Sequence, residues 1–126
     1  MLQHQDIRIG TLAGKGKDTA QYIRDILPHG FESFQINFWQ TLGGVDLKKL
    51  AVEVKAVLEG SGAVISSLGM FGNPLKGDAM AKDVIKAWEQ CIDTAHLFGC
   101  DIVAGFAGRV VDKPIPDSIP VFKKLF

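Results

Sequence analysis

The stretch AMAKDVIKAWEQCIDTAHLFGCDIVAGFAGR, residues 79–109, decides the fold of this chain. Its first two thirds repeat apolar residues every three or four positions, the spacing that places side chains on one face of a helix; they are Met80, Val84, Trp88, Cys91, Ile92, Ala95 and Phe98. Gly99 predicts the helix end, because glycine adopts the left-handed conformation at low cost. The apolar residues 101–104 then predict a short buried strand that opens into a glycine-rich loop ending at Arg109. In α/β proteins, substrates bind at this end of a strand.

The same order of strand, loop and helix recurs along the chain. Strands are predicted at residues 7–12, 33–38, 63–68 and 101–104, and the helices between them start after Asp18, Asp46 and the loop that precedes residue 79. Asp18 and Asp46 are the predicted N-caps, with Gln21 three residues after Asp18. Strands joined by single helices must run parallel, since only a crossover returns the chain to the same end of the sheet. The fold class is therefore α/β, with parallel β/α repeats of about four units.

The second predicted strand has two faces of different chemistry. Phe34, Ile36 and Phe38 point one way, whereas Gln35, Asn37 and Trp39 point the other. We expect one side of the sheet to pack into a core and the other to hold polar ligands.

The end of the sequence suggests half of a closed barrel. A last helix is predicted with Asp117 or Ser118 as N-cap and Pro120 in its first turn, where proline is tolerated, and it has barely begun when the sequence stops. Four parallel strands leave two open edges, and a closed (β/α)8 barrel takes about 250 residues. We expect residues 1–126 to form one partial domain, half of a TIM barrel.

Composition narrows the classes of function. The chain carries 14 basic and 14 acidic residues, and no basic cluster is larger than Lys48-Lys49 or Lys123-Lys124, which argues against a nucleic-acid or anionic-membrane surface. No apolar run reaches membrane-spanning length. Cys91 and Cys100 lack Cys-x-x-Cys spacing and are predicted to be buried thiols in a reducing compartment. These features are typical of a soluble cytoplasmic protein.

Four segments carry a family resemblance: Ile-x-Ile-Gly at residues 7–10, FQINFW at 34–39, ISSLG at 65–69, and AHLFGCDIVAGFAGR at 95–109. Together they resemble the N-terminal half of the sugar phosphate isomerase/epimerase family, the xylose isomerase-like barrels. The resemblance implies an eight-stranded barrel with a divalent metal, manganese or a similar ion. The metal binds oxygens of a small sugar or keto-acid while acidic residues move a proton between adjacent carbons.

The resemblance also implies that this chain lacks the reactive half. The family's metal ligands, two Glu, an Asp and a His, lie on strands five to eight, so no metal ligand and no catalytic residue is carried over. We expect no cofactor for this chain alone, and a partner that is either a second copy or a missing C-terminal half.

What the resemblance does carry over is the substrate-binding wall at the carboxyl ends of the strands: Gly10, Asn37, Trp39, Ser67, Gly69, Gly105, Phe106 and Arg109. The glycines leave room for a ligand or a close backbone approach. Trp39 and Phe106 can pack on the apolar face of a sugar. Asn37 and Ser67 can hydrogen-bond hydroxyl groups, and Arg109 can bind a carboxylate or phosphate.

Structural explanations compete with this interpretation. Strand-end glycines serve turns, Trp39 can pack at a rim, and Arg109 can be solvated beside Asp112. His4, His29 and His96 show no ligand spacing, and residues 14–19 lack the spacing of a phosphate-binding loop, which favours a surface loop.

Three function classes remain: half of a metal-dependent sugar or sugar-acid isomerase/epimerase; a non-catalytic half-barrel that self-associates as a structural or ligand-binding dimer; and a small doubly wound domain of the flavodoxin type. A phosphate-binding glycine pattern at the first strand-helix turn and an acidic cluster, which the third class favours, are both missing from the sequence.

Overall fold

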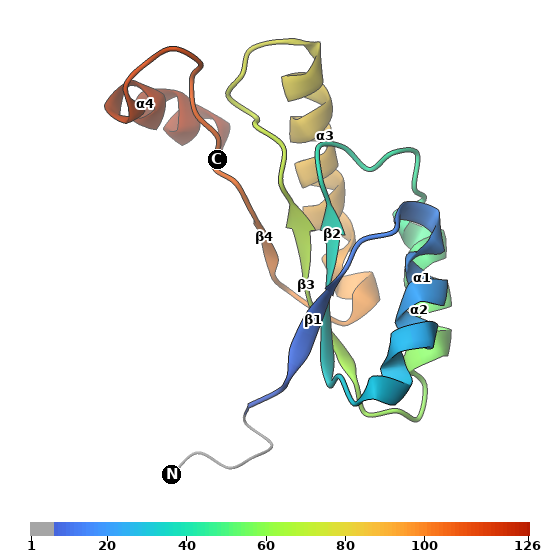
Figure 1. Ribbon diagram of the computed structural model, residues 1–126. Helices are drawn as coiled ribbons and strands as arrows, with labels where there is room; N and C mark the ends of the chain where they lie inside the picture. The colour runs from blue at the N-terminus through green and yellow to red at the C-terminus, as the bar shows by residue number, and fades with distance from the viewer. Residues whose placement is uncertain (1–6) are drawn as a thin grey trace.

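The computed structural model describes residues 7–126 and shows one parallel sheet with α-helices between and after its strands (Figure 1). Its strands, in both sequence and spatial order, are β1 (Gly10–Ala13), β2 (Ser33–Phe38), β3 (Val64–Met70) and β4 (Val103–Gly105). The helices are α1 (Thr19–Ile26), α2 (Leu47–Leu58), α3 (Ala79–Thr94) and α4 (Ile115–Leu125). Each pair of neighbouring strands is parallel. The predicted α/β fold of four β/α units, half of a (β/α)8 barrel, is confirmed.

One face of the sheet packs against α1, α2 and α3 and forms the core. Ile23 of α1, Val54 of α2 and Val84 of α3 are fully buried in one hydrophobic cluster together with Phe34 and Ile36 of β2. Each Å² of apolar surface buried contributes about 25 cal/mol to the stability of the fold, so this cluster is its main source. The predicted alternation of β2 is confirmed, because Phe34, Ile36 and Phe38 all belong to the core.

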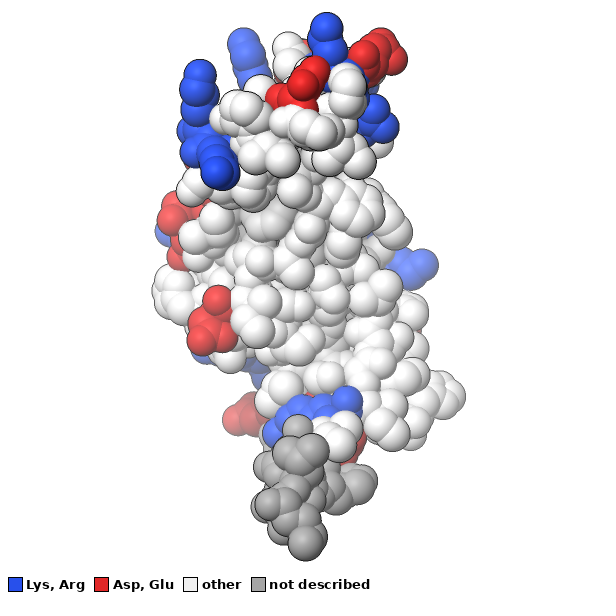
Figure 2. All heavy atoms as spheres, turned by 90° about the vertical axis from the view of Figure 1, so that its left-hand side faces the viewer, with Lys and Arg blue, Asp and Glu red and all other residues white. Residues whose placement is uncertain are grey.

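The opposite face, called the inner face below because it would line a closed barrel, is covered by none of the helices in residues 7–126. Sheet register assigns it a set of uncharged residues, since paired residues of parallel strands share a face: Gly10, Leu12, Ser33, Gln35, Asn37, Ser67, Gly69 and Ala104. From the side on which β4 and α4 lie, the centre of the surface is uncharged; charged residues gather at the top and bottom, and a few stand at the left and right margins (Figure 2).

The helix ends match the sequence signals in part. Asp46 caps α2, accepting hydrogen bonds from the backbone N–H groups of Lys48 (3.0 Å) and Lys49 (3.1 Å). The long helix ends as predicted, since α3 continues into a 3-10 turn, Ala95–Phe98, that stops at Gly99 with φ +78°. Asp18 makes no side-chain cap, contrary to prediction. Thr19 acts there instead, because its hydroxyl donates to the Gly16 carbonyl (2.7 Å) and accepts from the Lys15 N–H (3.0 Å).

The last helix differs from its prediction. α4 begins at Ile115, after Pro114, so Pro120 lies inside the helix and not in its first turn. The hydroxyl of Ser118 accepts a hydrogen bond from the backbone N–H of Val110 (2.9 Å) and is not a cap. α4 stands beside β4, away from α1 and α2 (Figure 1).

Several boundaries and faces also shift. β1 begins at Gly10, three residues later than predicted, and β4 spans Val103–Gly105. Met80 and Ile92, expected on the buried face of α3, are exposed, because the face that meets the sheet is narrower than the apolar stripe; its buried residues are Ala81, Val84, Ala87 and Cys91.

Within residues 7–126, no helix has the length and apolar character needed to cross a bilayer. Cys91 and Cys100 are buried free thiols, as predicted.

Candidate functional site

The sheet register brings three of the sequence-predicted site residues together on the inner face. Asn37 pairs with Gly69, and Gln35 pairs with Ser67, on the central strands β2 and β3. The absence of a side chain at Gly69 is what makes room for its neighbours. A Cβ there would lie 2.7 Å from Asn37 Oδ1 and 2.7 Å from Gln35 Nε2. The two amides therefore converge over a glycine near the carboxyl end of the sheet.

Asn37 is the most informative of these residues. Its side chain is only 5 % exposed, yet its Oδ1 atom has no hydrogen-bond donor among residues 7–126. Leaving a buried polar atom unpaired costs about 1–3 kcal/mol, so such atoms in a folded protein call for a partner. A hydroxyl or N–H group of a ligand would satisfy it once the side chains that cover the atom move aside, since the atom has almost no accessible surface.

A β-bulge adds a residue that sequence reasoning missed. The pairing jumps from Phe34↔Ile65 to Gln35↔Ser67, so Ser66 has no partner of its own on β2. Ser66 donates a hydrogen bond to the Phe34 carbonyl (3.2 Å). It also lines a hollow of about 390 Å³ on the inner face, with Gly10, Thr11, Leu12, Ser33 and Gln35. Period-2 alternation alone puts Ser66 and Ser67 on opposite faces, and nothing in the sequence marks the bulge.

Aromatic rings cross the carboxyl ends of β2, β3 and β4. The centroid of the Phe71 ring lies 5.7 Å from that of Trp39 and 5.1 Å from that of Phe106, the second pair edge to face. Trp39 and Phe106 are 66 % and 57 % exposed. The two predicted aromatic residues are thus joined through Phe71, which follows β3 and which the sequence marks only as part of a loop. Exposed rings beside polar groups suit the apolar face of a carbohydrate.

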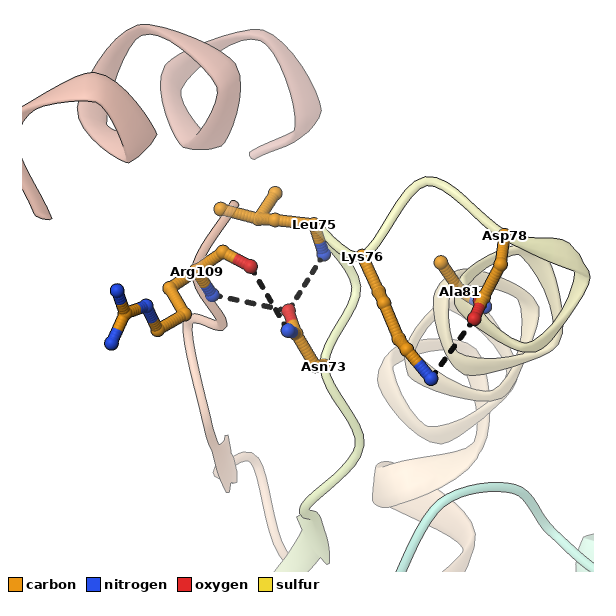
Figure 3. A network of polar contacts seen from close by, with 6 residues as sticks. All are labelled: Asn73, Leu75, Lys76, Asp78, Ala81 and Arg109. Atoms are coloured by element: carbon orange, nitrogen blue, oxygen red, sulfur yellow. Dashed lines mark hydrogen bonds and ion pairs between the residues drawn. The ribbon is translucent and has the colours of Figure 1, made fainter. Parts of the chain in front are cut away.

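Arg109 lies in a different setting (Figure 3). Its backbone is held by Asn73, whose Oδ1 accepts from Arg109 N (3.1 Å) and whose Nδ2 donates to the Arg109 carbonyl (2.9 Å). The guanidinium group points away from Asn73 and donates to the Lys113 carbonyl (2.8 Å). The exposed guanidinium thus has a backbone partner within residues 7–126 and lies apart from the inner-face amides.

Two of the predicted glycines do not border the candidate site. Gly105 pairs with Met70, and a Cβ there would overlap the Met70 carbonyl and meet the Trp88 ring, so this glycine permits the close approach of β4 and α3. Gly10 begins β1 and lies at the amino end of the sheet, not at the carboxyl end as predicted, because the strand starts later than its apolar pattern.

Nearby loops add no binding chemistry of their own. Next to the two hydrogen bonds between Asn73 and Arg109, called the Asn73 clamp below, Lys76 Nζ and Asp78 Oδ2 form an exposed ion pair of 3.0 Å (Figure 3). Asp78 caps α3 by accepting from Ala81 N (2.9 Å), and this hydrogen bond, followed by that of Lys76, lowers the pKa of the Asp78 carboxyl.

The described residues do not fit a divalent metal. No three His, Cys, Asp or Glu side chains within residues 7–126 come together as a ligand set, and the inner-face amides and hydroxyls carry no negative charge to balance the ion. His29 and His96 are exposed and far apart in the chain, and His4 lies outside the described residues.

The fold and the site together define an α/β half-barrel with a polar inner face and an aromatic rim. Compared with models of known protein families the chain gives no match, and compared with curated proteins it likewise gives none.

Proposed function

We propose that the inner face binds a small sugar or keto-acid, as the substrate-binding wall of a barrel of the sugar isomerase/epimerase type. The observation that carries this proposal is the buried and unpaired Oδ1 of Asn37, which lies with the Gln35 amide over Gly69. A sugar hydroxyl donates to an amide oxygen and accepts from an amide N–H, so one hydroxyl group can use both side chains.

The surroundings favour a sugar over other ligands of that size. Hydroxyl groups of Ser33 and Ser66 border the adjoining hollow, and the Trp39–Phe71–Phe106 row offers flat apolar surfaces at the carboxyl ends of the strands. Uncharged amides and hydroxyls match a neutral polyol better than a phosphate, which basic side chains and helix N-termini bind. For the carboxylate of a keto-acid, the Arg109 guanidinium would have to leave the Lys113 carbonyl and turn toward the inner face.

The proton transfer of such an isomerase is a proposal for a complete barrel only. It needs a general base and a metal, and neither is offered by the inner-face residues described above. We expect the 126-residue chain with added Mn²⁺ to give no isomerisation of ketoses. Turnover that is lost in Asn37→Ala would show instead that this half carries catalytic groups.

Binding is tested by NMR titration of the ¹⁵N-labelled chain with a ketopentose and, separately, a 2-keto-acid. We expect the side-chain amide signals of Asn37 and Gln35 and the indole signal of Trp39 to shift together in a saturable way. Loss of one hydrogen bond corresponds to about 3–10-fold weaker binding, which is the change expected for Asn37→Ala.

Two further variants sharpen the test. Gly69→Ala places a methyl group between the two amides and is expected to weaken binding without removing either amide. Val52→Ala changes a side chain that is 70 % exposed on α2 and should leave binding unchanged. Circular dichroism confirms that each variant is folded. Shifts confined to residues outside the inner face, or equal affinity in Asn37→Ala, would refute the proposed site.

A further inference from the structure

Both edges of the sheet are free within residues 7–126. β1 pairs only with β2, and β4 pairs only with β3. Free strand edges invite pairing with another chain, and soluble proteins normally cover or close them. Both edges carry exposed apolar residues. Ile7 and Ile9 precede β1 and Leu12 lies in it, whereas Ile102 and Phe106 flank β4 and Ile92 lies on α3. One edge therefore matches the other in chemistry.

We propose that a second copy of this chain closes the barrel, with β1 of each protomer pairing in parallel with β4 of the other. The strand order in space equals the order in sequence, so a half-turn about an axis along the strands places β1 of one copy beside β4 of its partner at two identical seams. The result is a ring of eight parallel strands, the number at which side chains just fill the interior of a barrel.

The charge distribution fits a second copy. Every residue that the register assigns to the inner face is uncharged, and the middle of the side shown in Figure 2 carries no Lys, Arg, Asp or Glu. Two identical faces can therefore meet without like-charge repulsion. A nucleic acid or an acidic peptide would instead require a basic surface.

The apolar area is sufficient for a stable dimer. Beyond the six edge residues, α4 exposes Ile115, Ile119 and Val121, and Phe126 directly after it is exposed as well. Ten apolar side chains, each at least 43 % exposed, are thus available to an interface, which in a stable complex takes about 800 Å² from each partner.

Closure would also complete the candidate site. The twofold axis runs through the lumen, so each copy would turn its Asn37, Gln35 and aromatic row toward those of its partner. A barrel closed in this way would have no acidic residue from these strands in its lumen, and it would bind a ligand without transforming it. The pairing itself does not require that a sugar binds, so the two proposals fail separately.

The first test is the mass of the chain in solution. Analytical ultracentrifugation over a wide concentration range should give twice the 13.7 kDa of one chain. A single species of 13.7 kDa at all concentrations, as expected if a covalent continuation of the chain covers the sheet, overturns the proposal.

The second test separates β1-to-β4 pairing from other contacts. Leu12→Lys places a charge on the inner face at the β1 edge, and Ile102→Glu places one directly before β4 at the opposite edge. Each variant alone should be monomeric. Mixed together, they should form a heterodimer by native mass spectrometry, because one seam joins Lys to Glu and the other is unchanged. A mixture that stays monomeric, or homodimers of either variant, contradicts this pairing. Val52→Lys on α2 is the matched control that should remain dimeric, and circular dichroism checks the fold of every variant.

Discussion

Asn73 holds the backbone of Arg109 through both atoms of its amide group, with hydrogen bonds of 2.9 and 3.1 Å. The side chain thus copies the pairing of a strand at the point where β3 and β4 have already separated. It also accepts from Leu75 N (3.0 Å), so one amide fixes two loops at the carboxyl end of the sheet. Gly108 adopts φ +79° beside it, and a Cβ there would clash with Asn73 Oδ1.

We expect Asn73→Ala to lower the free energy of unfolding by about 1–2 kcal/mol, since each of these hydrogen bonds contributes about 0.5–1.5 kcal/mol and part of the loss is recovered by water. Urea denaturation measures the change, and hydrogen exchange should locate the faster opening at residues 103–113. Lys76→Ala removes a neighbouring exposed ion pair and should change stability by less than about 0.5 kcal/mol. Equal effects of the two substitutions would mean that the amide clamp has no special role.

Asp46 and Asp18 form a matched pair for helix capping. Asp46→Ala removes an acceptor for two backbone N–H groups and is expected to cost about 1 kcal/mol. Asp18→Ala should be close to neutral, because Asp18 makes no cap hydrogen bond and Thr19 closes that loop. Thermal unfolding of both variants and of Thr19→Val provides the comparison, in which Thr19→Val should be the more damaging change at the α1 end. A large loss of stability in Asp18→Ala would show that Asp18 caps α1, as the sequence predicts.

Asp18 and Asp46 also show which structural features can be predicted from neighbouring residues alone. The alternation of β2, the Asp46 cap and the Gly99 stop depend on neighbouring residues, so the sequence predicts them and the structure confirms them. Asp18 carries the same local signal as Asp46, but Thr19 supplies a hydroxyl that reaches the preceding loop. Propensity ranks cap residues and does not decide between two adjacent ones.

Features that depend on register between distant segments escaped prediction. Ser66 reaches the inner face because of a bulge between β2 and β3, and Phe71 joins Trp39 to Phe106 across three strands. The Asn73 clamp spans 36 residues. Asn37 was predicted as a polar inner-face residue, but its missing hydrogen-bond partner becomes visible only once Gly69 and Gln35 are placed around it.

Gly105 should tolerate substitution much less than Gly10. A methyl group at Gly105 would overlap the Met70 carbonyl and lie 2.6 Å from the Trp88 ring, and neither the backbone nor the packed indole can move cheaply. Overpacking of this kind costs about 1–3 kcal/mol, and we expect Gly105→Ala to lie at the upper end. At Gly10 the nearest obstacle is the hydroxyl of Ser33, a small group that can rotate, so Gly10→Ala should cost less. Urea denaturation of both variants measures this order, and the reverse order would contradict the close approach of β4 to β3.

Burial should keep the Cys91 thiol protonated in alkali and unreactive toward thiol reagents as long as the chain is folded. Burial raises the pKa of Cys91 from 9.0 to about 12, so the folded state keeps a proton that the unfolded state releases above about pH 9. The stabilising contribution is therefore complete below pH 9 and is lost as pH rises from 9 toward 12. We expect the stability of the native sequence to fall more steeply over this range than that of Cys91→Ala, which lacks the Cys91 thiol and keeps only that of Cys100. Urea denaturation at several pH values gives the two slopes, and parallel slopes would show that burial does not hold the proton on Cys91.

Reaction with Ellman's reagent at pH 8 provides an independent check, because Cys91 should react only at the rate at which the core opens, whereas in urea it should react at once.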